Sequence, residues 1–398
     1  MLEHNHCYTS DAWEQRKLKD LIIKGGSGGT PNSRIKKYYI GNIPFLNISD
    51  ISTRNIQDSE KHISKQGMES CSAWLVPAGS ISLAMYASVG KVGVLMKPMA
   101  TSQAFYNLCF NDESLRNYVY SRLEKAQIYS EWNPYISTGT QSNLNAKKVL
   151  NFILEIPEPE EVEQIGKLFT ILDALIDAEK RKLDLLKQKK TALLRQIFGQ
   201  KLRFKGYSNH WECRKLGDMC SFRKGQGYSK KDIHDSGNPL LLYGQMYTNY
   251  MTVITSTDVY TKPHSHSVYS TGREVVVPAS GETREDIAVA SAVLQPGIIY
   301  GGDINVLTPA DYLDPVFLTL AISGGPAHRQ LAERAQGKTI VHLRNSDIAQ
   351  VDIQLPEESE QLRIAGLFIG IDNLIDTERR KINLLGIKKK ALLQKMFV

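Results

Sequence analysis

The sequence has 398 residues, of which 42% are hydrophobic and 23% charged, and its formal net charge is +7. That size leaves room for two or three domains with cores, and the mild basic excess is compatible with a polyanionic partner. No apolar run approaches the ~20 residues of a membrane span, and no signal peptide is recognisable. Five cysteines at scattered spacing indicate reduced thiols, so we expect a cytoplasmic protein without disulfides.

The chain begins with a segment, residues 1–12, that we expect to be a mobile tail rather than a metal site built on His4, His6 and Cys7. The first folded segment opens with W-E-Q-R-K-L-K-D at Trp13, and we place the end of this domain at residue 155. The glycine-dense stretch Gly25–Pro31 predicts either a flexible loop or a loop that closely approaches a nucleic-acid backbone, since basic residues and tyrosines follow it. Short apolar runs predict strands, and one amphipathic run predicts a helix: Ile43–Leu46, Trp74–Val76, Ile81–Met85 and Val92–Met96 for the strands, Glu113–Lys125 for the helix.

A long helix is predicted from Pro157 to Phe198, within a spacer segment 156–205. Its apolar residues recur at steps of three and four, which places them in one stripe. At 1.5 Å per residue the helix is about 60 Å long and needs a partner along that stripe. Acidic residues fill its first half and basic residues its second half.

The second half of the chain repeats the first. The block W-E-C-R-K-L-G-D at Trp211 opens a second domain, 206–355, and Pro356–Phe397 repeats the long helix, with about half of its positions identical. We expect strands and a helix again: Asn238–Leu242, Glu274–Val277, Ile287–Val293 and Ile304–Leu307 for the strands, Pro315–Ser323 for the helix. A period of this length indicates duplication of a whole domain with its helix.

The charge order of the two helices predicts an antiparallel pair, because only then do acidic halves face basic halves. Such pairs set orientation, and burial of the apolar stripe provides the stability. The seam is expected to be imperfect, because charged residues interrupt it near Glu179–Lys182. Gly370 and Gly386 also weaken the second helix, which spans the segment 356–398. The residues expected in the seam or at partner contacts are Phe169, Leu172, Ile176, Leu186, Leu193, Phe368, Ile375, Leu385 and Leu392.

Basic, amide and tyrosine side chains in the loops are the candidates for DNA contact. A basic cluster followed by tyrosines suits phosphates, while glutamine and asparagine can bond adenine edges. Each cluster also fits an ordinary solvated loop. The candidates are Arg34, Lys36, Lys37, Tyr38, Lys91 and Gln141 in the first domain, and Lys230, Lys231, Tyr243, Gln245, Tyr247, Asn249, Arg284 and Lys338 in the second.

Motifs of catalysis are weak or absent. Gln336–Thr339 lacks the first glycine of a phosphate-binding loop, and Asn133–Tyr135 lacks the second proline of a methyltransferase loop, so both fit ordinary turns. His264 and His266 have no third ligand at zinc spacing. A chain with two similar domains and no catalytic constellation is more typical of a binding protein than of an enzyme.

In the order of its blocks, the chain resembles the specificity subunit of type I restriction-modification systems over nearly its full length. The resemblance is carried by the two W-E-x-R-K-L openings, by I-P-E-P-E-E-V-E-Q-I-G from Ile156 and L-P-E-E-S-E-Q-L-R-I-A-G from Leu355, and by both K-K-x-A-L-L blocks. It implies two target recognition domains that each read half of a split DNA site. It also implies spacer helices that bind two modification (methyltransferase) subunits, to which restriction subunits add ATP-dependent translocation and cleavage.

The resemblance implies no catalytic site, metal or cofactor in this chain; S-adenosylmethionine, ATP and Mg²⁺ are expected in the partner subunits. The predicted fold is mixed α/β: two globular domains joined by two long antiparallel helices in a pseudo-twofold tandem repeat. Because the loops of the two domains differ, the DNA site is expected to be asymmetric. A stand-alone DNA methyltransferase and a coiled-coil adaptor without a DNA role are the alternatives.

Overall fold

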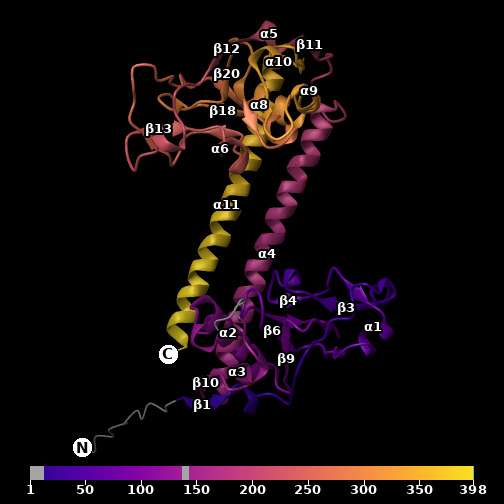
Figure 1. The fold of residues 1–398 in the computed structure, drawn as a ribbon. Coiled ribbons are helices and arrows are strands. Elements are labelled where there is room, and N and C mark those ends of the chain that lie inside the picture. Colours follow the sequence, from indigo (N-terminus) through magenta and orange to yellow (C-terminus); the bar gives the residue numbers. More distant parts are fainter. Residues whose placement is uncertain (1–12, 137–142, 398) are drawn as a thin grey trace, which may run out of the picture. The chain divides into compact units, whose positions relative to one another are not determined.

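The computed structural model describes residues 13–136 and 143–397. The chain divides into two compact units. The first unit comprises the described residues up to 181 and from 380 onward, and the second comprises residues 182–379. Two long helices, α4 (Pro159–Phe198) and α11 (Glu358–Met396), contribute one half to each unit (Figure 1). Both lie where the sequence predicts them, each starting two residues after the predicted proline.

The globular part of the first unit is mixed α/β. Its elements are β1 (Glu14–Lys17), η1 (Leu18–Asp20), β2 (Lys24–Ser27), η2 (Lys36–Tyr39), β3 (Ile43–Leu46), η3 (Ile48–Asp50), β4 (Asn55–Ile56), β5 (His62–Ile63), α1 (Lys65–Glu69), β6 (Ile81–Ala84), β7 (Val92–Leu95), β8 (Ala100–Thr101), β9 (Phe105–Cys109), α2 (Glu113–Ile128), η4 (Asn133–Tyr135), α3 (Ala146–Leu150) and β10 (Ile153–Ile156).

Two sheets carry this first domain. The larger has the order β2-β9-β6-β7-β4 and the smaller the order β5-β3-β8, while β1 pairs with β10. The central strands β6 and β9 are buried throughout, which explains their nearly continuous apolar sequence. Helix α2, capped by the side chain of Asp112, packs against β7.

The glycine-dense stretch is a strand in its first half, so the predicted loop from Gly25 is wrong there. Gly25 and Gly26 pair with β9. A Cβ atom on Gly25 would lie 2.8 Å from the hydroxyl of Tyr106, and one on Gly26 would lie 3.2 Å from the indole nitrogen of Trp74. Glycine is therefore required by close approach of aromatic rings to a strand rather than by flexibility.

The globular part of the second unit follows the same plan. Its elements are β11 (Glu212–Lys215), α5 (Leu216–Met219), β12 (Cys220–Lys224), η5 (Lys230–Asp232), β13 (Asn238–Leu241), α6 (Gln245–Thr248), β14 (Val253–Ile254), β15 (Tyr260–Thr261), β16 (Glu274–Pro278), β17 (Ser280–Gly281), α7 (Arg284–Ile287), β18 (Ser291–Val293), β19 (Ile299–Tyr300), β20 (Ile304–Pro309), α8 (Pro315–Gly324), α9 (Pro326–Arg334), β21 (Val341–His342), α10 (Asn345–Ala349) and β22 (Asp352–Leu355).

The sheets of the second domain match those of the first strand by strand. Its larger sheet has the order β12-β20-β16-β18-β14, its smaller sheet β15-β13-β19, and β11 pairs with β22. The short pair β17-β21 is additional among the described residues. The duplication read from the sequence is thus a duplication of topology.

Two predicted strands need correction. The run Ile287–Val293 is a strand only from Ser291, because Thr283 caps a helical turn that ends at Ile287. The run Trp74–Val76 makes only an isolated bridge between Val76 and Met99. Local apolar character could not distinguish a paired strand from a packed loop in either place.

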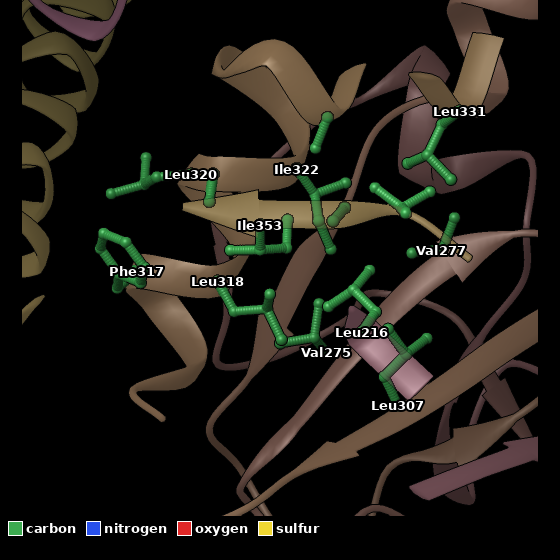
Figure 2. Packing of buried hydrophobic residues seen from close by; sticks show 14 of the residues in the cluster. Leu216, Val275, Val277, Leu307, Phe317, Leu318, Leu320, Ile322, Leu331 and Ile353 are labelled. Carbon is green, nitrogen blue, oxygen red and sulfur yellow. The ribbon is translucent and has the colours of Figure 1, made fainter. Parts of the chain in front are cut away.

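Each unit has its own core, and each core includes residues of both long helices. In the second unit, Phe198 of α4 and Phe368 of α11 join a cluster with residues of α8, β16 and β20. Figure 2 shows part of this cluster, where Leu318 of α8 lies beside Val275 and Ile353 from the strands. In the first unit, Phe169 of α4 and Phe397 at the end of the chain take the equivalent places and stack with centroids 5.8 Å apart.

The halves of the two helices run antiparallel within each unit, as predicted. In the first unit, Asp173 and Glu179 of α4 bond Lys389 and Lys381 of α11, so rising numbers on one helix meet falling numbers on the other. In the second unit, Lys182 bonds Glu378, and Lys190 bonds Asp372 at 2.5 Å. Within each unit, charged residues that interrupt the apolar stripe therefore pair across the two helices.

All nine side chains predicted for the seam or partner contacts are at least partly buried. Phe169, Phe368 and Ile375 are buried, and the other six are half-buried. Leu168 and Leu175 belong to the same sequence stripe, but they are 38% and 40% exposed. The stripe is wider than the surface that the partner helix covers.

Candidate nucleic-acid interface

The first basic cluster lies on η2 and just before it, beside the small sheet of the first domain. Arg34, Lys36 and Lys37 are exposed, and Tyr38 is half-buried. Two hydrogen bonds hold this segment in place. The hydroxyl of Tyr39 donates to the carbonyl of Pro31 at 2.6 Å, and the amide of Ser64 donates to the carbonyl of Tyr38. The result is a rigid turn that presents cations to solvent.

The second domain places a basic turn at the equivalent position. Lys230 and Lys231 lie on η5 and are exposed. Ser229 and Asp232 form a capping box around this turn, and the amide and hydroxyl of Ser229 hold the pKa of Asp232 below its ordinary value. Like η2, η5 comes just before the central strand of the three-stranded sheet. The structure therefore brings the two predicted basic clusters to matching places in the two domains.

The polar loop after β13 is only partly available for contact. The Oε1 atom of Gln245 accepts from the amide of Leu242 at 2.9 Å, and its Nε2 atom donates to Thr257 at 3.4 Å. The rings of Tyr243 and Tyr247 pack 6.3 Å apart, and burial raises the pKa of Tyr247. Asn249 is exposed at the end of this turn. Gln245 fixes the loop internally, which leaves Asn249 and the tyrosine edges as the accessible groups.

Two further candidates of the second domain lie around the β17-β21 pair. Arg284 is exposed on α7, which packs against β21, and Lys338 is exposed in the loop between α9 and β21. A cavity of about 310 Å³ adjoins this pair and is lined by Lys224, Ser280, His342 and Arg344, among others. Ser280 and His342 hydrogen-bond at 2.9 Å. Lys224 and Arg344 add two cations that the sequence analysis missed, because only the fold brings them together.

The two remaining candidates of the first domain are not joined to η2. Lys91 is half-buried and lines a cavity of about 250 Å³ with Arg54, Glu124 and Asp173. Gln141 lies outside the described residues. The assignment of Lys91 to DNA contact stays a prediction.

The rejected motifs have structural roles. Asn133–Tyr135 forms the 3₁₀ turn η4, in which Tyr135 packs on Trp132 and Phe152. Gly337 has a φ of +138° and turns the chain before β21. The imidazole of His264 stacks on Tyr228 at 4.5 Å.

Within the described part of the chain, no three His, Cys, Asp or Glu side chains gather as a metal site requires. No helix in that same part is both long and apolar enough to cross a membrane. The chemistry that the exposed clusters do offer is cationic and aromatic contact on two equivalent surfaces. Such groups suit phosphates and base edges.

Comparison with known proteins agrees with this geometry. The model of the type I restriction modification DNA specificity domain matches twice, at residues 10–188 and 208–386. The type I restriction enzyme MjaIX specificity subunit of Methanocaldococcus jannaschii is 24% identical, over 96% of this chain and 92% of its own length. The EcoR124I/EcoR124II specificity subunit of Escherichia coli is 23% identical over 44% of this chain and 46% of its own length.

The fold is also similar to solved structures. The S subunit of a type I restriction-modification system from M. genitalium superposes with a TM-score of 0.65 at 13% identity, covering 100% of this chain and 98% of that one. A chain from a structure of complex assembly and conformational transition of the type I R-M system gives a TM-score of 0.54 at 15% identity, covering 97% and 98%.

Proposed function

This chain belongs to the type I restriction-modification DNA specificity family and carries the family's domain twice, and we propose that each of its two domains reads one half of a bipartite, asymmetric DNA site. We assign residues 1–155 and 206–355 to the two recognition domains, and 156–205 and 356–398 to the helices that set the spacing between the half-sites. The chain then acts where the DNA is, in the cytoplasm.

The observation that carries this proposal is the pair of equivalent surfaces with unlike side chains. The turn η2 presents Lys36 and Lys37, with Arg34 just before it, whereas η5 presents Lys230 and Lys231. The following loop is η3 in one domain and the tyrosine-rich α6 in the other. Equivalent placement supports equivalent use, and unlike side chains support unlike half-sites.

The proposal includes partners. We propose that the paired helices hold two modification subunits, which contribute S-adenosylmethionine and the methyl transfer. Restriction subunits, with ATP and Mg²⁺, would complete the complex. This chain would contribute DNA recognition without catalysis, and binding of two copies of one partner is supported by the likeness of the two helices.

The first alternative, a methyltransferase acting alone, differs in one measurable property. We expect the isolated chain to show no heat of binding when titrated with S-adenosylmethionine, and the complex with its modification subunit to show it. Saturable binding of the methyl donor by the isolated chain would support the alternative.

The second alternative, an adaptor without a DNA role, is tested with the assembled complex. We expect sequence-specific binding that weakens steeply as salt rises, because cations on this chain and its partner neutralise phosphates. Glutamine at Lys36 and Lys37 should lower the salt slope by about one unit for each lost phosphate contact. Binding without dependence on DNA sequence would contradict the proposal.

A further inference from the structure

A cluster of buried and half-buried charges joins the first recognition domain to both helices of its unit. Arg54 is 5% exposed, and its Nη1 atom lies 3.2 Å from Oδ2 of Asp173 on α4. Lys389 of α11 bonds the other oxygen of Asp173 and lies 2.5 Å from Glu124 on α2. Burial raises the pKa of Glu124, which the charge of Lys389 opposes. We call Arg54, Glu124, Asp173 and Lys389 the first seat.

The first seat is fixed further by neutral neighbours. The guanidinium of Arg54 lies 4.2 Å from the centre of the Tyr120 ring, and its Nη2 atom donates to Asn117 at 2.7 Å. Lys91, Asp177 and Lys180 line the adjoining cavity. Two cations and two carboxylates of the seat balance in charge, and loss of one leaves a buried charge without its counterion.

The second unit has an equivalent seat with different chemistry. Lys190 of α4 lies 2.5 Å from Asp372 of α11 and donates to Thr252 of the second domain at 3.0 Å. Duplication places Asp173 on Asp372 and Lys389 on Lys190. Thr252 takes the place of Arg54, because Arg54 directly precedes β4 and Thr252 directly precedes the equivalent strand β14. The carbonyl of Arg54 accepts from the amide of Val94, and the carbonyl of Thr252 accepts from the amide of Ala292.

The remaining carboxylate is also replaced in the second seat. At the spacing of 199 residues that relates the two long helices, Ser323 corresponds to Glu124, and its hydroxyl accepts from the amide of Ala290 at 2.9 Å. The lysine–aspartate pair is therefore common to both seats. Arg54 and Glu124 are an additional, mutually balancing pair of the first.

We propose that Arg54 and Glu124 are positioning residues that hold the first recognition domain in one orientation on the paired helices of its unit. Each charge bonds a different helix: Arg54 bonds α4 through Asp173, and Glu124 bonds α11 through Lys389. Two contacts to two helices restrain rotation of the domain as well as its separation. The expected change in DNA binding rests on the proposed function, whereas the expected change in domain orientation does not.

The test uses the full chain and the residues of the second seat. Arg54→Thr leaves two carboxylates with one cation, and Glu124→Ser leaves the opposite imbalance. The double variant Arg54→Thr/Glu124→Ser restores neutrality and copies the second seat. Spin labels on non-natural amino acids at Lys36 and Leu384, both in the first unit and exposed, report the orientation of the domain by pulsed dipolar spectroscopy.

We expect one narrow distance distribution for the parent chain, a broader or shifted one for each single variant, and recovery of a narrow one in the double variant. Labels at Lys231 and Leu374 in the second unit should report no change. The exposed pair Lys65 and Glu69 offers a control, Lys65→Thr/Glu69→Ser, which should leave both distributions unaltered. If Arg54→Thr fails to fold, Arg54→Lys replaces it in the test. Lysine keeps the positive charge but loses the hydrogen bond to Asn117, so it should broaden the distance distribution less than Glu124→Ser does.

An unchanged distribution in the single variants, or a double variant as broad as the singles, would overturn the proposal. A second measurement separates it from the proposed function. In the assembled complex, the ratio of Kd values for DNA with a spacer one base pair too short and with the native spacer should fall toward one in Arg54→Thr. Absence of specific DNA binding by the parent complex would sink the proposed function and leave the distance measurement standing.

Discussion

Glu274 shows how one buried carboxylate closes a loop of the second domain. It is fully buried at the start of β16 and accepts from the amides of Thr271, Gly272 and Arg273 at 2.9–3.2 Å. Arg223 of β12 lies 2.7 Å from it. Burial alone would raise the pKa of Glu274, but the three amides and the hydroxyl of Thr271 hold it below its ordinary value.

Substitution of Glu274 by glutamine should therefore destabilise the second unit. The substitution removes the negative charge and points the NH₂ group of the new side chain at backbone amides. We expect it to lower the free energy of unfolding, measured in urea, by about 2–3 kcal/mol. Because the folded pKa is lowered, the stabilisation is present above the unfolded pKa and is lost as pH falls through the folded pKa. The variant should lose that acid dependence, while Asp258→Asn, at an exposed position, should behave like the parent.

The cysteines should differ in reactivity. Burial raises the pKa of Cys220 to about 12, whereas Cys213 is exposed. At pH 8 we expect iodoacetamide to label Cys213 and spare Cys220 in the folded chain, and to label both in urea, as read by peptide mass spectrometry. Because the pKa of the Cys220 thiol is raised in the folded state, its contribution to the stability of the fold is complete below the pKa of the unfolded chain and is lost as pH rises toward 12. Equal labelling of the folded chain would contradict the raised pKa and partial burial of Cys220.

At the scale of elements, the glycines of the long helices offer a paired test. A Cβ atom at Gly370 or Gly386 of α11 meets nothing within 4 Å, so alanine there should stabilise the chain by about 0.5–1 kcal/mol per site. A Cβ atom at Gly166 of α4 lies 3.0 Å from the amide of Tyr118 and 3.1 Å from the carbonyl of Ser114. Gly166→Ala should lower the melting temperature. If alanine stabilised the chain at all three sites, helix propensity alone would govern the stability of these helices, and the close contacts of Gly166 would have no effect.

The helices were the most predictable elements because their signals are local and repeated. Period, charge order and duplication predicted both spans and the antiparallel direction. The sequence could not show which charges meet: Glu179 and Lys182 looked like interruptions of an apolar seam, yet they bond Lys381 and Glu378. Charge sign sets direction, but partners depend on rotation about the helix axis.

The globular elements were less predictable where tertiary contacts override local signals. The sequence predicts a loop at Gly25, but in the structure the ring of Tyr106 packs closely against it in a strand. The sequence predicts a strand at Ile287, but Thr283 caps a helical turn that ends there. In each case the deciding partner is distant in sequence or invisible to a propensity argument.

At the scale of the whole molecule, duplication made both the family and the fold readable from the sequence. The blocks that carried the resemblance lie at the domain openings and on α4 and α11. The candidate contact residues lie in loops that differ between the copies, so neither copy predicts the other. The domain bounds and the individual DNA contacts stay predictions.

Exchange of residues 206–355 for the corresponding segment of another family member tests the central claim most directly. The exchanged chain is assembled with its modification subunit in a host without other methylation, and the modified sites are read by methylation-sensitive long-read sequencing. The account predicts a new site in which one half and the spacer are retained and the other half is changed. A site altered in both halves, or in neither, would contradict it.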